Sequence, residues 1–315
     1  MRRLLITRQI AEPVIAAARA RFDVTLGRDA LSEDAAAQAL RDFDAILPTL
    51  GDAFSAGAFA AAGVPRCRML GNFGVGFNHI DVEAARAAGV MVSNTPDVLT
   101  DATADIGWTL ILATARRAGE GERMLRAGRW AGFGPEGLLG THVSGKTLGI
   151  VGMGRIGQAV ARRGHFGFGM PVVYFNRSEK DPDFPARRID TLAGLMAAAD
   201  FVVVCVPGGA GTARLIDAKA LAAMKPGGIF VNIARGEVVD EAALIEALEA
   251  GRIRAGLDVY ENEPQVPARL IACENAVLLP HLGSATVETR EAMGRMALDN
   301  IIAWADGRDP PQRVA

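Results

Sequence analysis

The chain has 315 residues, and its 34 basic and 36 acidic side chains give a formal net charge of −2. Half of the residues are hydrophobic, which is enough for a large core and excludes disorder as the dominant state. The near-neutral charge gives no broad attraction to nucleic acid or to a membrane surface, and no apolar run suits a signal peptide or a membrane span. The three cysteines form no C-x-x-C pair, so we expect reduced thiols and a cytoplasmic location.

Short apolar runs alternate with alanine-rich helical stretches in the first third of the chain. This rhythm of strand and helix predicts a parallel sheet that is covered by helices on both faces. We expect strands at residues 4–6, 45–47, 69–71 and 90–92, and helices at residues 12–21 and 81–88.

The length of the chain favours two domains. A helical stretch from Asp101 toward Arg126 is too long for an ordinary crossover, so we expect one helix that bridges the domains, followed by an extended loop at residues 128–144. A second series of strands and helices then predicts a second parallel sheet, and one last helix covers residues 286–306. The strands of this series are expected at residues 148–151, 172–175, 201–206, 228–233, 255–259 and 276–279.

Two segments match the pattern G-x-G-x-x-G, at residues 132–137 and 152–157. The first has no strand before it and contains a proline, whereas the second follows an apolar strand and opens a helix. In such a turn Gly152 makes the tight bend, Gly154 lets the backbone approach a pyrophosphate, and Gly157 lets the helix pack closely on the strand. The helix amino end then offers N–H groups to the phosphates, which predicts a dinucleotide site. This site comprises Gly152, Gly154, Arg155, Ile156 and Gly157.

The predicted strand at residues 172–175 ends without the carboxylate that NAD sites usually place there to bind the ribose. Asn176, Arg177 and Ser178 follow instead. A guanidinium can pair with a 2′-phosphate, and the two neighbours can add hydrogen bonds, so the sequence favours NADP. The alternative is a solvated Arg177 with Glu179 as a displaced carboxylate, which would suit NAD.

Three of the later predicted strands lead into an arginine, an acidic segment and a histidine. Arg235 follows the strand at residues 228–233, and His281 follows the strand at residues 276–279. Between them, the strand at residues 255–259 leads to the acidic segment Glu261–Glu263. Because the carboxyl ends of parallel strands share one edge of a sheet, these side chains can converge beside the nicotinamide.

With these motifs, the chain resembles the D-isomer-specific 2-hydroxyacid dehydrogenases over nearly its whole length. The segments that carry the resemblance are residues 72–76, 94–98, 152–157, 232–236, 256–264 and 280–286. The resemblance implies an α/β fold of two doubly wound parallel-sheet domains, in which a Rossmann cofactor domain is inserted into a flavodoxin-like substrate domain. We expect residues 1–98 and 286–315 to form the substrate domain and residues 99–285 to form the dinucleotide-binding domain.

The resemblance assigns catalytic roles to Arg235, Glu263 and His281. Arg235 would hold the substrate carboxylate and polarise the carbonyl oxygen, while His281 would exchange a proton with that oxygen. Glu263 would orient the imidazole and favour its protonated form. The expected cofactor contacts are Thr103, Gly152, Gly154, Arg155, Ile156, Gly157, Asn176, Arg177, Ser178, Val206, Pro207, Thr212, Ala234, Asp258, His281 and Gly283. The expected substrate contacts are Leu50, Val75, Gly76, Arg235, His281 and Ser284, and no metal site is expected.

Residues 94–105 and 279–286 are most similar to the glyoxylate/hydroxypyruvate reductase branch of the family. This similarity implies an oxidoreductase that reduces small 2-oxo acids to D-2-hydroxy acids with NADPH, with NAD as a possible cofactor. The alternatives are an NAD-dependent dehydrogenase of the D-lactate or 3-phosphoglycerate type, or a dinucleotide-sensing binding protein without turnover. Residues 101–130 resemble the dimer-forming segment of the family, so we expect a homodimer. Trp130 either reaches the partner's active site or is an interface or core residue.

Overall fold

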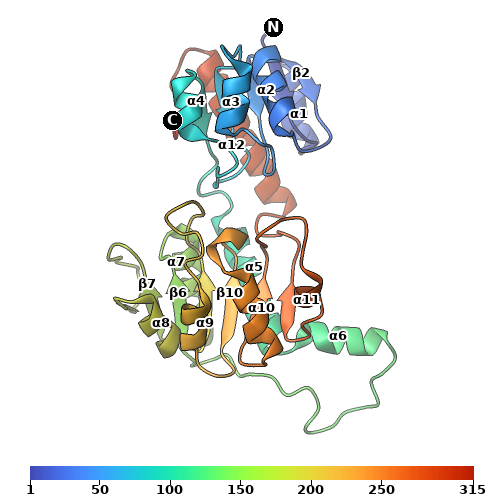
Figure 1. Cartoon of the computed structure of the whole chain (residues 1–315), viewed down its shortest axis with the longest axis vertical. Helices are drawn as coiled ribbons and strands as arrows, with labels where there is room; N and C mark the ends of the chain where they lie inside the picture. The colour runs from blue at the N-terminus through green and yellow to red at the C-terminus, as the bar shows by residue number, and fades with distance from the viewer. The chain divides into compact units, whose positions relative to one another are not determined.

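The computed structural model describes residues 1–315, which divide into two compact units (Figure 1). Unit 1 comprises Met1–Leu99 and Ser284–Ala315, and unit 2 comprises Thr100–Gly283. Unit 1 is therefore discontinuous in sequence, and unit 2 is inserted between its two segments. None of the helices combines the length and the hydropathy that a bilayer-spanning helix needs.

Unit 1 is built on a five-stranded parallel sheet with the order β2-β1-β3-β4-β5. This order reverses direction between β1 and β3, so the loops after these two strands flank a topological switch point, where ligands bind in open α/β sheets. The strands are β1 (Arg3–Ile6), β2 (Asp23–Leu26), β3 (Ala45–Leu47), β4 (Met69–Gly71) and β5 (Met91–Ser93), and the helices are α1 (Glu12–Arg19), α2 (Glu33–Asp42), α3 (Ala56–Ala62), α4 (Val82–Ala87) and α12 (Val287–Ala305).

The sheet of unit 1 is covered on both faces by apolar clusters. Helices α2, α3 and α4 contribute to the cluster that contains Leu40 and Phe59. Helices α1 and α12 contribute to the other cluster, which contains Ile15 and Ile301. A Cβ at Gly71 would lie 2.7 Å from Cγ1 of Ile301, so α12 packs directly on β4 through a position that only glycine fits.

The segment after α12 returns to the edge of this sheet. The N–H of Val314 donates to the carbonyl of Val92 at 2.8 Å, and Arg313 forms an antiparallel bridge with Ser93. These contacts satisfy backbone groups that the edge strand β5 would otherwise expose.

Unit 2 is built on a seven-stranded parallel sheet with the order β12-β11-β10-β9-β6-β7-β8, and its switch point lies between β6 and β9. Figure 1 shows α8, α9 and α10 on one face of the sheet and α5 and α7 on the other, and each face has its own buried apolar cluster. The strands are β6 (Leu148–Val151), β7 (Val172–Phe175), β8 (Ala186–Arg188), β9 (Phe201–Val204), β10 (Ile229–Asn232), β11 (Arg254–Leu257) and β12 (Ala276–Leu278). The helices are α5 (Thr100–Ala115), α6 (Ala118–Arg126), α7 (Arg155–Phe168), α8 (Leu192–Ala198), α9 (Ala218–Ala223), α10 (Glu241–Glu249) and α11 (Ala268–Ile271), with a short 3₁₀ turn at Gly236–Val238.

The prediction of one continuous helix toward Arg126 is wrong, because the helix ends at Ala115 and a second helix, α6, begins at Ala118. Arg117 between them has a positive φ of 53° and donates two hydrogen bonds to the carboxylate of Glu120. The returning chain also closes the end of α5, because the N–H of Thr141 donates to the carbonyl of Ala115 at 2.7 Å. The left-handed Arg117 therefore marks the break, and a residue distant in sequence caps the last carbonyl of the helix.

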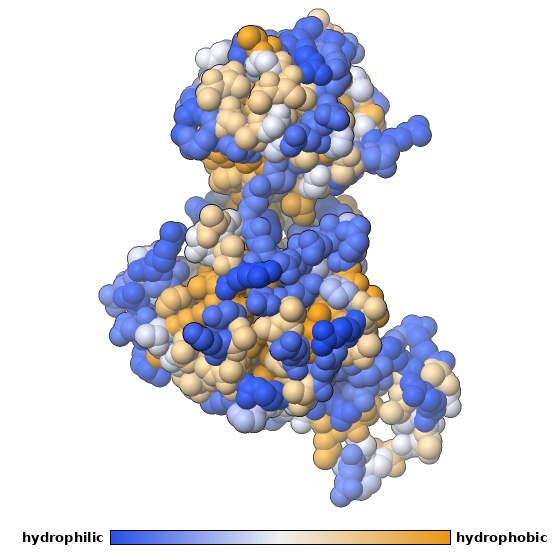
Figure 2. All heavy atoms as spheres, viewed as in Figure 1, coloured by the Kyte–Doolittle hydropathy of each residue, from blue (hydrophilic) through white to orange (hydrophobic).

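Helix α6 and the loop of residues 128–140 extend away from the body of unit 2 as an arm (Figure 1). Several large apolar side chains of this arm are exposed to solvent, and Figure 2 shows hydrophobic and hydrophilic atoms interspersed over it. The first of the two glycine patterns, at residues 132–137, lies in this loop and opens no helix. The exposed side chains are Leu125 (60%), Trp130 (60%), Phe133 (94%) and Leu139 (62%).

Candidate active site

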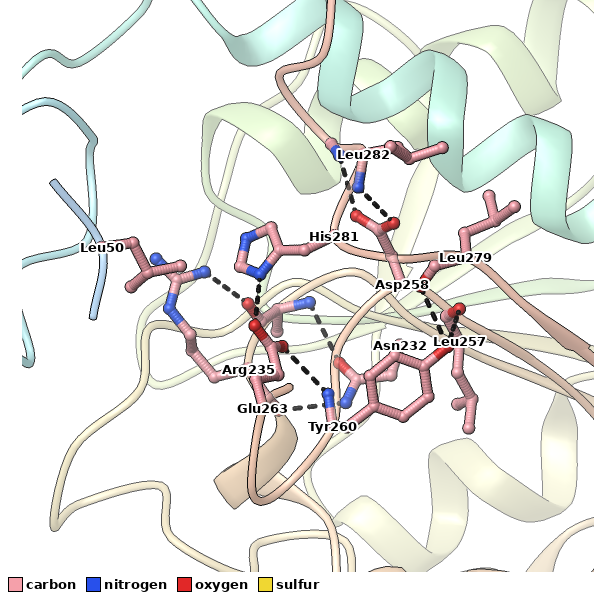
Figure 3. Close-up of polar contacts among 12 residues, drawn as sticks. Leu50, Asn232, Arg235, Leu257, Asp258, Tyr260, Glu263, Leu279, His281 and Leu282 are labelled. Atoms are coloured by element: carbon pink, nitrogen blue, oxygen red, sulfur yellow. Dashed lines mark hydrogen bonds and ion pairs between the residues drawn. The ribbon is translucent and has the colours of Figure 1, made fainter. Parts of the chain in front are cut away.

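Three neighbouring strands of unit 2 bring an arginine, a glutamate and a histidine to one edge of the sheet. Strands β10, β11 and β12 are adjacent and parallel. Arg235 follows β10, Glu263 follows β11 and His281 follows β12, so all three lie beyond the carboxyl ends of these strands (Figure 3). In open α/β sheets this edge is where ligands bind.

The turn that carries Arg235 is held by Asn232, the last residue of β10. The side chain of Asn232 donates to the carbonyl of Arg235 at 3.0 Å and accepts from the N–H of Ala234 at 3.0 Å (Figure 3). The residue after Arg235 must be glycine, because a Cβ at Gly236 would lie 1.9 Å from the carbonyl carbon of Tyr260. These contacts fix the backbone from which the guanidinium projects.

Burial dominates the electrostatics of Arg235. It lowers the pKa of the guanidinium, although the charges of Glu263 and Glu237 act in the opposite direction. An arginine nevertheless keeps its charge at neutral pH. A cation that has lost part of its hydration interacts strongly with an incoming carboxylate or carbonyl oxygen, because the local dielectric constant is low.

His281 and Glu263 form a close pair, with 2.8 Å between Nδ1 of the imidazole and Oε2 of the carboxylate (Figure 3). The other carboxylate oxygen accepts from the N–H of Tyr260 at 3.1 Å. Burial raises the pKa of Glu263, but the hydrogen bond and charge of His281 and the N–H of Tyr260 outweigh burial, so the pKa lies below its usual value. An ionised Glu263 assigns the proton to Nδ1 and leaves Nε2 to exchange a proton with a substrate.

Asp258, one residue beyond β11, holds the turn that contains His281. The N–H of His281 donates to the backbone carbonyl of Asp258 at 2.9 Å. The N–H groups of Leu282 and Gly283 donate to its two carboxylate oxygens at 2.7 and 2.8 Å. His281 has a φ of 54°, a conformation that non-glycine residues rarely adopt. Burial raises the pKa of Asp258, although these N–H groups partly offset the effect.

The glycine loop after β6 lies at the switch point of the sheet. Gly152 has a φ of 96°, and a Cβ there would lie 2.8 Å from the backbone nitrogen of Val206. A Cβ at Gly157 would lie 2.2 Å from the carbonyl oxygen of Gly152, so helix α7 packs tightly on the loop. A Cβ at Gly154 would meet nothing within 4 Å, and no side chain caps the amino end of α7. Open space next to uncapped N–H groups fits a pyrophosphate, so the residues suit a dinucleotide.

The turn after β7 contains the residues that should meet the adenosine ribose. Oδ1 of Asn176 accepts from the N–H of Met153 in the glycine loop at 3.2 Å, and Nδ2 donates to the carbonyl of Ser178 at 2.8 Å. Asn176 therefore joins this turn to the glycine loop. Arg177 lies on this turn, and its side chain is exposed to solvent. It can therefore contact a substituent on the ribose.

The other residues predicted to bind the cofactor also belong to unit 2. Thr212 closes the loop after β9, because its hydroxyl donates to the carbonyl of Pro207 at 2.6 Å. Thr103 lies beside the His281 turn, since a Cβ at Gly283 would be 3.4 Å from its Cγ2 and 3.3 Å from Oδ2 of Asp258. Their contacts with a cofactor remain predictions.

The remaining substrate residues of the prediction belong to unit 1. Leu50 follows β3 at the switch point of that sheet, and its carbonyl accepts from Nη1 of Arg8 at 2.7 Å. The loop after β4 is held by two asparagines, which bond the carbonyl oxygens of Val75 and Gly76. Ser284 begins the second segment of unit 1. Their contacts with a substrate remain predictions.

Sequence reasoning assigned no role to Tyr260, although it lies in a motif that carries the resemblance. Its N–H bonds Glu263, and its hydroxyl donates to the carbonyl of Leu279 at 2.9 Å (Figure 3). Tyr260 therefore connects the segment of Glu263 to the segment of His281. No sequence pattern indicates this role, because it depends on how two loops meet.

Comparison with known proteins agrees with this geometry. Residues 108–283 match the family model of the D-isomer specific 2-hydroxyacid dehydrogenase, NAD binding domain. The chain is 44% identical over 322 residues to a glyoxylate reductase of Thermococcus kodakarensis, and the alignment covers 99% of this chain and 96% of that protein. It is 48% identical over 248 residues to glyoxylate/hydroxypyruvate reductase B of Serratia proteamaculans, and the alignment covers 77% of this chain and 76% of that protein.

A solved structure extends the match to the whole fold. The NADPH-dependent glyoxylate/hydroxypyruvate reductase of Sinorhizobium meliloti, in complex with NADP and malonate, is similar with a TM-score of 0.89 and 37% identity over 100% of this chain and 97% of that one. The predicted fold class and the predicted family are confirmed. The chain belongs to the D-isomer-specific 2-hydroxyacid dehydrogenases, a family of NAD(P)-dependent oxidoreductases.

Proposed function

We propose that this protein reduces glyoxylate and hydroxypyruvate with NADPH and releases the 2-hydroxy acid, of D configuration where C2 is chiral. The observation that carries the proposal is the 2.8 Å pair of His281 and Glu263 at the same sheet edge as Arg235. The relatives from Thermococcus kodakarensis and Serratia proteamaculans, which are named for these two substrates, support the choice of substrate.

The side chains match the needs of a 2-oxo acid. Its carboxylate and its carbonyl oxygen both accept hydrogen bonds, and the planar guanidinium of Arg235 offers several donors in one plane. Nε2 of His281 donates the proton that the carbonyl oxygen takes up on reduction, and Glu263 stabilises the protonated imidazole that makes this transfer. The bound nicotinamide cofactor supplies the hydride. In the direction of oxidation, neutral His281 accepts the proton.

The proposed cofactor is NADPH, with NADH as a weaker alternative. The turn after β7 carries Arg177 and no carboxylate at the end of the strand, which suits a 2′-phosphate better than a free 2′-hydroxyl. The relative from Sinorhizobium meliloti is described as NADPH-dependent, which supports the same assignment.

Unit 1 carries the other residues that we propose as substrate contacts. Backbone N–H groups of Val75 and Gly76 would bind the substrate carboxylate, and Leu50 would contact the substrate beside C3. Hydroxypyruvate carries a hydroxyl at C3, and a buried hydroxyl without a partner costs about 1–3 kcal/mol. We assign Ser284 as that partner.

Initial rates on a panel of 2-oxo acids, each with NADPH and with NADH, test the proposed function. We expect glyoxylate and hydroxypyruvate to have higher kcat/KM than pyruvate, NADPH to be preferred, and glycerate formed from hydroxypyruvate to be the D isomer. A tenfold preference for pyruvate would support the D-lactate type instead. Cofactor binding without turnover of any 2-oxo acid would support a dinucleotide-sensing protein.

We also propose that the arm of α6 and residues 128–140 forms a homodimer. Its exposed Trp130 and Phe133 would bury their apolar surface against a second copy. Sedimentation of the native chain should give the mass of a dimer, and Phe133→Asp should shift it toward the monomer.

The free thiols Cys67, Cys205 and Cys273 support our expectation of a reducing, cytoplasmic location.

A further inference from the structure

The turn after β7 is reached by a second guanidinium in addition to that of Arg177. Strand β8 lies parallel to β7 with Arg188 opposite Tyr174, so the last residue of β8 is level with the end of β7. From this position Nη2 of Arg188 donates to the backbone carbonyl of Arg177 at 3.5 Å. The sequence pattern did not indicate this residue, because it lies 11 positions further along the chain.

The turn between the two arginines is rigidly held. The hydroxyl of Tyr174 accepts from the N–H of Lys180 at 3.0 Å and donates to the carbonyl of the same residue at 3.1 Å. At the other end, Asn176 bonds the N–H of Met153 and the carbonyl of Ser178. A turn that is fixed at both ends loses little backbone freedom when a ligand binds.

The charge of Arg188 is available to a ligand. Its bond to Arg177 uses one of five N–H donors, and the acceptor is a neutral carbonyl oxygen, so the positive charge is not cancelled. Both arginine side chains are exposed, so a ligand at this edge can reach them. A phosphate monoester carries about −1.5 to −2 charges at pH 7, and one guanidinium does not neutralise it.

We propose that Arg188 is a second specificity-determining residue, which binds the 2′-phosphate of NADP together with Arg177. The proposal rests on the proposed use of NADPH and deepens it, since it assigns the 2′-phosphate to a pair of guanidinium groups from neighbouring strands. An NADH molecule, which has no 2′-phosphate, would gain nothing from the second arginine.

The dissociation constants of four ligands test this proposal in the full-length protein. NADPH and NADH are titrated by fluorescence, and adenosine 2′,5′-bisphosphate and 5′-AMP, which differ only in the 2′-phosphate, are titrated by calorimetry. We expect Arg188→Gln to weaken NADPH and the bisphosphate about tenfold, the lower end of the contribution of one charge-assisted contact. NADH and 5′-AMP should change less than about twofold, because the lost contact is to the phosphate alone.

Two further variants complete the experiment. Arg187→Gln is the matched control, because neighbouring residues of a strand point to opposite faces and Arg187 lines a groove with His165 and Met170. It should leave all four constants unchanged. Arg188→Lys keeps the charge and should recover part of the loss.

Each result is decisive. A uniform loss for all four ligands in Arg188→Gln would show that Arg188 only supports the turn, and an unchanged preference for the 2′-phosphate would remove it from the site. Either result overturns the inference and leaves the proposed function intact, provided that the wild type prefers NADPH. A wild type without that preference would overturn both.

Discussion

Asp258 binds three consecutive N–H groups, beginning with that of His281. The first bonds its carbonyl oxygen, and the next two bond its carboxylate. The left-handed conformation of His281 is thus held by a single residue just beyond the neighbouring strand β11, which places the imidazole beside Glu263. This relationship makes Asp258 a positioning residue for the proton donor, in addition to its predicted contact with the cofactor.

Asp258→Asn tests this relationship. The amide has one oxygen, so one of the two N–H groups of Leu282 and Gly283 loses its acceptor and meets an NH₂ group. We expect the free energy of unfolding to fall by about 1–3 kcal/mol and kcat to fall roughly 10- to 100-fold, because the donor is misplaced. Chemical denaturation and single-turnover kinetics measure the two effects. A weaker affinity for NADPH with unchanged kcat would mean that Asp258 acts only as a cofactor ligand.

His281→Ala should remove the proton donor. We expect the rate of 2-oxo acid reduction to fall by roughly 10²–10⁴-fold, the usual contribution of a positioned acid–base group. The affinity for NADPH, followed by fluorescence, should change little, because it depends mainly on the glycine loop and the turn after β7. A variant with near-normal turnover at neutral pH would contradict the assignment.

Glu263→Gln should change the pH dependence of catalysis rather than abolish activity. The amide keeps the shape of the carboxylate but loses its charge, so the protonated form of His281 loses its partner at 2.8 Å. Reduction requires that form, and we expect the falling limb of the rate profile to move to lower pH. Rates of reduction measured from pH 5 to 9 give the shift. If the limb stayed at the wild-type position, the pair would have no part in proton transfer.

Arg177→Ala should discriminate between the two cofactors. We expect the dissociation constant of NADPH to rise by roughly 10- to 150-fold, which corresponds to about 1.5–3 kcal/mol for one charge-assisted contact. NADH should bind almost as before, and direct titration of both cofactors makes the comparison. Equal losses of affinity for NADPH and for NADH would show that the Arg177 side chain does not bind the 2′-phosphate.

The three cysteines should be unreactive in the folded protein. Burial raises the pKa of Cys67 and of Cys205 to about 12, and it also raises the pKa of Cys273. The thiolate is the reactive form and is scarce far below the pKa, so the rate of modification should increase about tenfold per pH unit. Ellman's reagent at pH 8 should detect no fast thiol before denaturation and three after it. A thiol that reacts within seconds in the native protein would contradict the raised pKa values.

The strands of the two sheets were predictable where both faces are buried. Residues 148–151 and 201–204 are continuous apolar runs that lie in the centre of the sheet of unit 2, and both strands were predicted. Strands β2 and β8 were missed because they lie at sheet edges and contain charged, partly exposed residues. The end of α5 was missed because no glycine or proline marks it: Arg117 takes the left-handed conformation there, and the N–H of Thr141, far along the chain, caps the carbonyl of Ala115.

The edge of the sheet that carries the candidate catalytic residues was predictable for a similar reason. The segments that follow buried parallel strands lie at the carboxyl edge of the sheet, so the segments of Arg235, Glu263 and His281 could be placed from strand order, whereas the choice of these three residues as catalytic came from the family resemblance. The residues that position them could not be found in this way. The roles of Asn232 and Tyr260 depend on hydrogen bonds between loops, and these appear only when the whole fold is known.

The discontinuity of unit 1 also bears on the order of events during synthesis on the ribosome. The five strands of its sheet emerge first, but the face of β4 that α12 covers at Gly71 and Ile301 lacks its cover until the final helix is made. Unit 2 is continuous over residues 100–283 and has its own two clusters, so it can fold while that face is still open. The nascent chain therefore carries an uncovered apolar surface for the time needed to translate more than half of the protein, which is the period in which chaperones would bind it.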